Sequence, residues 1–291
     1  MESHLTARRV GSTSTSSRTR AGRPRQSAPA RARPRKALGQ HFLSDPNILN
    51  RIVDAADLAA GDRVLEIGAG PGELTSVLAE RGFAVTAVEL DRGLTEGLRR
   101  RFASSANVVV VEADGLHLET KALFGGEQFA VVANLPYNAG TAMVRRLLES
   151  EAKPRRLVVL LQKEVALAMV APPGQMSLMG LGVQVYAAGR KLFDVPPGAF
   201  YPPPKVMSSV ILLDVLPEPR VPEPEIARFF AVARAGFSAP RKQLHNALMN
   251  GLGLPADAIA MALRLAGIDP AVRPRELSVE QWLALSRAVR G

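Results

Sequence analysis

Cysteine is absent from this 291-residue chain, and histidine is scarce, with four residues scattered along the sequence. Without cysteine there can be no disulfide and no Cys-ligated zinc, and histidines without ligand spacing predict no metal. No apolar run approaches the roughly 18 residues of a membrane-spanning helix, so we expect no membrane association. These absences are typical of a protein of the reducing cytoplasm, and we expect this chain to act there as a monomer.

Positive charge is plentiful, but it is unevenly distributed. Residues 1–36 carry nine Arg and one Lys against a single acid, a net charge of +9, which leaves only +1 for the other 255 residues. This segment has almost no large apolar residue, so it cannot bury enough surface to fold, and we predict a disordered basic tail over residues 1–35. The tail is either an arm that attracts RNA phosphates, a transit peptide or an extension without a role; no helical periodicity supports the transit peptide.

An asparagine closes the apolar run 129–133 and is followed by Leu135, Pro136 and Tyr137. The Asn134 side-chain oxygen and the Leu135 carbonyl can both accept hydrogen bonds from one exocyclic amine. The Tyr137 ring offers a face for stacking a base. A strand followed by an ordinary proline turn would look the same, and only the accompanying motifs favour a base-binding site.

Three earlier strand ends supply those motifs. The run 64–67 enters a turn with glycines at Gly68, Gly70 and Gly72, a spacing that differs from the one that seats a pyrophosphate. The next strand ends in Glu89, whose carboxylate can accept hydrogen bonds from both hydroxyls of a ribose. The third runs to Asp114, which can accept from an adenine amino group. Each acid alone is more often a solvated surface residue, but the series predicts an S-adenosylmethionine site beside an amine acceptor.

Strands and helices alternate as far as residue 161, which predicts a Rossmann-like, doubly wound α/β sheet. Asp45-Pro46 predicts a helix start, since an N-cap residue precedes a proline at the first helical position. Segments 181–192 and 208–213 are strand-like and predict an antiparallel extension. We therefore expect a catalytic domain over residues 36–216 and a small helical, RNA-contacting domain over 217–291, with helices at 226–237, 242–249, 256–266 and 279–289.

The chain resembles the rRNA adenine-N6 dimethyltransferases, which include the KsgA-type small-subunit enzymes and the Erm resistance methylases. The resemblance runs from Lys36 to the C-terminus. It is strongest at residues 39–43, 66–72, 134–138, 162–165 and 195–206. The proline-rich stretch 195–206 and the segment 267–270 favour the KsgA branch. Met179 before Gly180, and Pro240 before Arg241, depart from the family pattern, which affects local RNA contacts rather than the methyl-transfer site.

The resemblance implies N6-dimethylation of adenines in small-subunit rRNA during ribosome assembly, with S-adenosylmethionine as cofactor and the immature small subunit as partner. It assigns the following cofactor-binding residues: Gln40, His41, Leu43, Gly68, Gly70, Glu89, Asp114 and Asn134. The catalytic set is Asn134, Leu135, Tyr137 and Phe200. Phe200 is either a second stacking face, which the resemblance favours, or a core aromatic held by prolines; we expect its neighbour Tyr201 to point away. The candidates for phosphate contact are Lys205, Arg241, Lys242, Arg273 and Arg275.

Other functions remain open. An Erm-type large-subunit methyltransferase is the nearest alternative. A DNA adenine or protein-glutamine methyltransferase shares the motif, but those groups typically have proline where this chain has Leu135. A non-catalytic assembly factor of the same fold would have no need of Glu89, Asp114 and Asn134 together.

Overall fold

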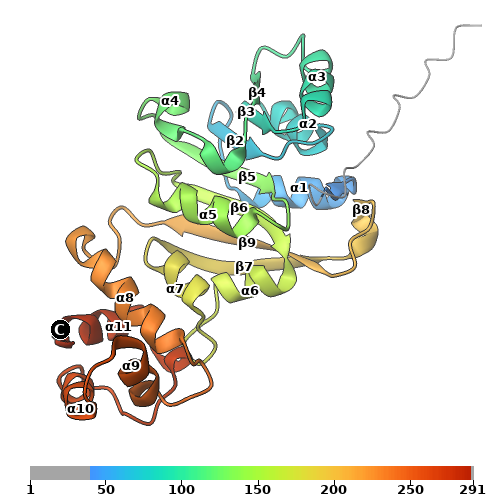
Figure 1. The fold of residues 1–291 in the computed structure, drawn as a ribbon. Coiled ribbons are helices and arrows are strands. Elements are labelled where there is room, and N and C mark those ends of the chain that lie inside the picture. The colour runs from blue at the N-terminus through green and yellow to red at the C-terminus, as the bar shows by residue number, and fades with distance from the viewer. Residues whose placement is uncertain (1–39, 290–291) are drawn as a thin grey trace, which may run out of the picture. The chain divides into compact units, whose positions relative to one another are not determined.

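The computed structural model describes residues 40–289 (Figure 1). The predicted basic tail, residues 1–35, lies outside the described residues. No helix in the described range is long and apolar enough to cross a membrane.

A seven-stranded sheet forms the centre, in the order β4-β3-β2-β5-β6-β9-β7. Its parallel strands are β2 (Arg63–Ile67), β3 (Ala84–Glu89), β4 (Val108–Glu112), β5 (Phe129–Asn134) and β6 (Arg156–Gln162). Two strands extend it antiparallel, β9 (Ser208–Val215) beside β6 and β7 (Ala187–Val195) beside β9. The predicted mostly parallel sheet with an antiparallel extension is confirmed.

Helices cover both faces of the sheet (Figure 1). They are α1 (Pro46–Ala55), α2 (Glu73–Glu80), α3 (Arg92–Arg101), α4 (Thr120–Phe124), α5 (Gly140–Glu149), α6 (Lys163–Met169) and α7 (Leu178–Gln184). Successive residues of a strand point to opposite faces, and β5 shows this clearly. Val132 packs in one core cluster with α1 and α2, while Val131 and Ala133 pack in another with α5. The fold is therefore doubly wound.

The first helix begins where the sequence predicts. Both Asn47 and Ile48 donate their backbone N–H to Asp45 Oδ1, at 2.9 and 3.2 Å, and Pro46 occupies the first helical position. An Asp at this position satisfies donors that the helix itself leaves unpaired, and proline there loses nothing because its missing N–H would have no partner. The cap fixes the direction in which the chain leaves residues 40–43.

The predicted strand 181–192 is wrong in its first part. Residues up to Gln184 belong to α7, and β7 begins only at Ala187. Ser177 caps α7, since its Oγ accepts the Gly180 N–H at 2.9 Å, and Leu181 and Val183 are buried. Local capping and packing outweighed the strand-like composition of this short segment.

Four helices follow the sheet, as predicted: α8 (Ile226–Phe237), α9 (Leu244–Leu252), α10 (Ala256–Leu265) and α11 (Val279–Ala288). They enclose the fully buried Trp282, and their core is continuous with the buried residues on one face of the sheet. The domain boundary between residues 216 and 217 stays a prediction.

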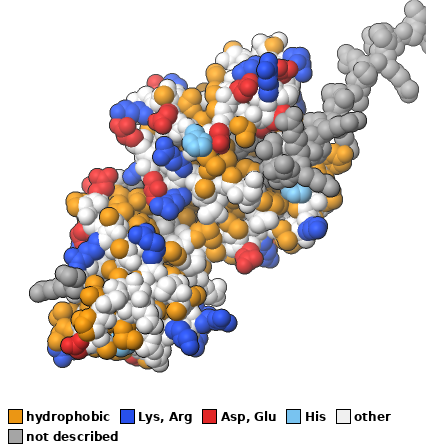
Figure 2. Space-filling view, viewed as in Figure 1, with side chains coloured by type: hydrophobic (Ala, Val, Ile, Leu, Met, Phe, Trp, Pro, Cys, Tyr) orange, Lys and Arg blue, Asp and Glu red, His pale blue; other side chains and the backbone are white. Residues whose placement is uncertain are grey.

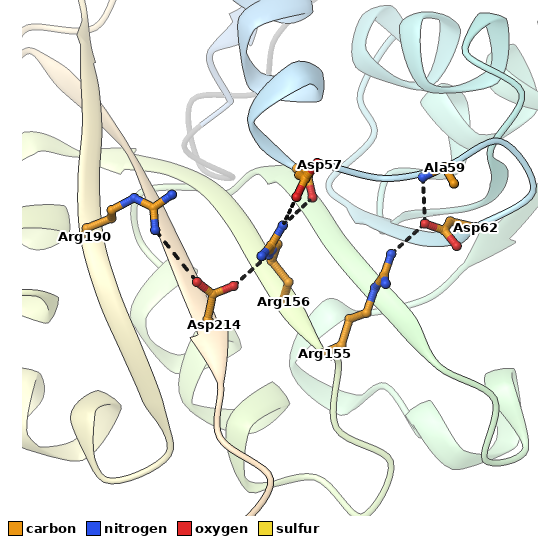
Figure 3. Close-up of polar contacts among 8 residues, drawn as sticks. Asp57, Ala59, Asp62, Arg155, Arg156, Arg190 and Asp214 are labelled. Carbon is orange, nitrogen blue, oxygen red and sulfur yellow. Dashed lines mark hydrogen bonds and ion pairs between the residues drawn. The ribbon is translucent and has the colours of Figure 1, made fainter.

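Charged side chains stabilise the sheet at the amino ends of its parallel strands (Figure 3). Arg156, at the start of β6, donates to Asp214 of β9 at 2.7 Å and to Asp57 after α1 at 3.4 Å. Its neighbour Arg155 donates to Asp62 at 2.6 Å. Open α/β sheets bind ligands at the opposite edge, beyond the carboxyl ends of the strands.

Candidate functional site

A cavity of about 210 Å³ lies at that opposite edge, beyond the carboxyl ends of β2, β3, β4 and β5. Eight of the predicted site residues line it: Gln40, His41, Gly68, Glu89, Asp114, Asn134, Leu135 and Tyr137. They come from five separate parts of the chain, and the parallel strand order brings them to one place.

The glycine-rich turn after β2 needs glycine for two reasons. Gly68 and Gly70 have φ angles of 75° and 57°, in the left-handed region that side chains disfavour. A Cβ on Gly70 would also lie only 3.0 Å from the Phe42 ring. Gly70 does not line the cavity; instead its N–H donates to Glu89 Oε2 at 2.8 Å. Its observed contact therefore holds Glu89 in place, and a direct contact with the cofactor stays a prediction.

Glu89 is 6% exposed at the end of β3 and is fixed at both oxygens. Besides the Gly70 bond, its Oε1 accepts the Asp91 N–H at 2.9 Å. A carboxylate oxygen has two acceptor positions, so each oxygen can accept another hydrogen bond from a group in the cavity. The side chain is thus held in one orientation before any ligand arrives.

Asp114 lies after β4 and caps the short 3₁₀ helix Gly115–His117. Its Oδ1 accepts the Leu116 N–H at 2.9 Å, and its Oδ2 lies 3.2 Å from Nδ1 of His117. Apolar side chains that the sequence did not single out form the walls beside these two acids, among them Leu90 and Leu116. Leu90, directly after Glu89, is 51% exposed. An apolar residue directly after this strand end is the sequence feature from which a wall of the cavity could be predicted.

The Asn134 amide has a defined orientation. Its Nδ2 donates to the backbone carbonyl of His41 at 2.9 Å, although the two residues are 93 positions apart. The Leu135 N–H donates to the Leu160 carbonyl at 3.1 Å, which continues the sheet pattern. Among the described residues, no donor is bonded to Asn134 Oδ1 or to the Leu135 carbonyl. The cavity therefore contains two neighbouring acceptors, as an exocyclic amine requires.

Tyr137 and His41 are packed against each other at the cavity. Their ring centroids are 5.3 Å apart and their planes differ by 28°. The Tyr137 hydroxyl is hydrogen-bonded to Ser208 Oγ at 2.6 Å, and burial raises the pKa of Tyr137 above its ordinary value. His41 is held in turn by a 2.7 Å bond between Nδ1 and the Pro202 carbonyl. One face of the Tyr137 ring is thus occupied, and only the other can receive a ligand.

Leu43 and Phe200 are not brought to the cavity. They face each other in the short antiparallel pair of β1 (Phe42–Leu43) and β8 (Phe200–Tyr201), and each is 4% exposed in the hydrophobic core. Phe42 lines the cavity instead, and Tyr201 is 45% exposed. Of the two interpretations of Phe200, the core aromatic is confirmed, because the alternation along β8 places its side chain inward and that of Tyr201 on the opposite side.

Within residues 40–289, no group of three or more His, Asp or Glu side chains is arranged so that it could hold a metal ion. The arrangement is instead rich in fixed hydrogen-bond acceptors between apolar walls. Such a site suits an uncharged or cationic ligand with hydroxyl and amine donors and a flat ring system.

This chain is similar to known proteins that are named as rRNA methylating enzymes. The family model described as ribosomal RNA adenine dimethylase matches residues 31–290. A protein of Dehalococcoides mccartyi named ribosomal RNA small subunit methyltransferase A is 43% identical over 254 residues, covering 87% of each chain. The protein of the same name in Geobacter metallireducens is 40% identical, covering 88% of this chain and 96% of its own.

Solved structures agree with the sequence relatives. A dimethyladenosine transferase from Plasmodium falciparum superposes with a TM-score of 0.70 at 25% identity, covering 84% of this chain and 96% of its own. The 23S rRNA methyltransferase ErmE gives 0.69 at 28% identity, covering 85% and 99%. The fold is therefore similar to that of a dimethyladenosine transferase and to that of a 23S rRNA methyltransferase.

Proposed function

The chain belongs to the ribosomal RNA adenine dimethylase family, and from that premise we propose that it transfers methyl groups from S-adenosylmethionine to N6 of adenines in small-subunit rRNA. The observation that carries this proposal is the Asn134 amide, whose nitrogen is held by His41 while its oxygen is left for a substrate amine. The names of relatives at 40–43% identity support the choice of the small subunit.

The cavity fits the cofactor by the chemistry of its acceptors. Glu89, fixed by two backbone N–H groups, would accept hydrogen bonds from the ribose hydroxyls. Asp114 would accept from the adenine amino group, with Leu90 and Leu116 against the ring. Gly68 would leave room for the methionine end, since a Cβ there would lie 3.7 Å from Pro136 and from the Asn134 carbonyl oxygen. When bound, S-adenosylmethionine supplies an electrophilic methyl group attached to a positively charged sulfur.

Asn134 and Leu135 would act on the target amine. The lone pair of an adenine N6 is delocalised into the ring, which makes this nitrogen a poor nucleophile. Two acceptors, Asn134 Oδ1 and the Leu135 carbonyl, would hold its two N–H groups and favour a pyramidal nitrogen with a localised lone pair. Because positive charge develops on nitrogen during transfer, these hydrogen bonds strengthen in the transition state and so lower the barrier.

Tyr137 would position the base. A target adenine must leave its stack to reach the cavity, at a cost of a few kcal/mol. Stacking on the exposed face of Tyr137 would offset part of this cost, since a base–aromatic contact contributes about 1–3 kcal/mol. The hydrogen bond to Ser208 and the contact with His41 hold the ring in place before the base enters. The Tyr137 ring is thus already oriented for stacking.

A direct experiment uses labelled cofactor with three acceptors: immature small subunits, naked large-subunit RNA and duplex DNA. We expect label in the small-subunit RNA, and nucleoside analysis should find N6,N6-dimethyladenosine. Label confined to large-subunit RNA would favour the Erm-type activity, which the similar fold of ErmE makes the natural alternative. The absence of transfer to any acceptor would contradict the proposal.

A further inference from the structure

Exposed hydrophobic side chains are concentrated in the segment 201–207. Eight large hydrophobic residues are exposed in the described part of the chain, and three of them belong to this segment: Tyr201 (45%), Val206 (46%) and Met207 (37%). Single exposed apolar residues are common, but a local group of them marks a surface that binds something. The segment also carries an exposed Lys205, which forms no ion pair with any other described residue.

This segment is held firmly at both ends. His41 Nδ1 bonds to the Pro202 carbonyl at 2.7 Å, and the Lys163 N–H donates to the Met207 carbonyl at 3.0 Å. Between them, three consecutive prolines at 202–204 restrict the backbone further. An exposed surface on a restrained backbone loses little conformational entropy when it binds a partner.

The segment begins beside one wall of the cavity. Tyr201 pairs with Phe42 across the β1–β8 ladder, and Phe42 lines the cavity together with His41. Opposite residues in an antiparallel pair place their side chains on the same face, with Cβ atoms about 4.5–5.5 Å apart. Tyr201 therefore lies next to Phe42, a residue of the cavity wall.

We propose that Tyr201, Val206 and Met207 form a stacking platform for a nucleotide that neighbours the target adenine, with Lys205 contacting its phosphate. The proposal rests on the proposed function and deepens it. Extruding one base leaves a face of its neighbour without a stacking partner. An aromatic ring next to apolar side chains and a cation is the combination that binds single-stranded nucleic acid without regard to sequence. The occupant is RNA because the cavity beside the platform receives the target base.

The test combines a protein change with an RNA change. Tyr201→Ala removes the ring, Tyr201→Phe keeps it, and Val109→Ala serves as a matched control because Val109 is 60% exposed on the distant edge strand β4. Substrates are small subunits reconstituted with RNA that has an abasic nucleotide on the 5′ or the 3′ side of the methylated adenines. Methyl transfer is measured as kcat and KM, and cofactor affinity is measured by calorimetry.

On intact RNA, Tyr201→Ala should raise KM for the subunit about 10-fold, the size of one stacking contact. Cofactor affinity should not change, and Tyr201→Phe and Val109→Ala should resemble the wild type. When the abasic nucleotide is on the side that stacks on Tyr201, the wild type and Tyr201→Ala should have the same KM. If Tyr201→Ala still raises KM with both abasic substrates, or does not raise KM on intact RNA, the proposed platform is refuted. If the wild type itself methylates no RNA, the proposed function fails rather than the platform.

Discussion

Glu89 offers a sharp test of how the protein prepares the site for its cofactor. The change Glu89→Ala removes the carboxylate that accepts the N–H groups of Gly70 and Asp91 at 2.8 and 2.9 Å. It also removes the proposed acceptor for the ribose hydroxyls. The variant should therefore lose stability without ligand and affinity with ligand, and the two losses can be measured separately.

The size of each loss follows from the contacts. A hydrogen bond to a charged group contributes about 1.5–3 kcal/mol, which corresponds to about 10- to 150-fold weaker cofactor binding. Each N–H group left without an acceptor in this buried position costs about 1–3 kcal/mol of the free energy of unfolding. The loss of stability should be apparent before any cofactor is added, because both N–H groups are bonded within the protein itself.

Calorimetry with S-adenosylmethionine gives the affinity, and urea unfolding without ligand gives the stability. Glu112→Ala is the matched control, since Glu112 lies opposite Glu89 in the β3–β4 ladder but is exposed and forms an ion pair with Arg99 at 3.6 Å. Such a surface pair contributes about 0–1 kcal/mol. Wild-type cofactor affinity in Glu89→Ala, or an equal loss of affinity in Glu112→Ala, would show that the Glu89 carboxylate does not bind the cofactor.

Two further predictions concern neighbouring side chains. Tyr137→Phe keeps the stacking ring but leaves Ser208 Oγ, which is fully buried, without its partner, so urea unfolding should show a loss of about 1–2 kcal/mol while kcat stays within a few-fold. Adding Ser208→Ala should recover part of this loss; a larger loss in the double variant would contradict the pairing. Burial raises the pKa of Glu66, which is 2% exposed, from 4.5 to about 8. The folded protein then binds more protons than the unfolded chain between these two values, so the free energy of unfolding should fall as the pH rises through this window. Glu66→Gln should reduce that fall, which urea titrations at about pH 5 and pH 8 would detect; the same slope in both proteins would mean that Glu66 ionises normally.

Much of the site could be predicted because its polar residues follow strands. In a parallel sheet, residues that end successive strands meet at one edge, so Gly68, Glu89, Asp114 and Asn134 could be grouped from their positions alone. The structure brings all four to one cavity.

The errors come from contacts that sequence spacing does not encode. Strands β1 and β8 have two residues each, too few for alternation to show which side chain faces the core, so the sequence left Phe200 open between a stacking face and a core aromatic. The bond between Asn134 and the His41 carbonyl joins residues 93 positions apart and depends on a backbone atom. Neither residue type nor spacing predicts such a bond.

In the proposed mechanism, the Asn134 side-chain oxygen acts on the substrate amine. Single-turnover methyl transfer to immature small subunits by Asn134→Ala tests it most directly, with cofactor affinity measured on the same preparation and Asn47→Ala, an exposed residue of α1, as the control. We expect the transfer rate to fall about 100- to 1,000-fold, the usual effect of removing one preorganised transition-state hydrogen bond, with cofactor affinity within a few-fold of the wild type. A transfer rate close to that of the wild type, or a loss explained wholly by weaker cofactor binding, would contradict it.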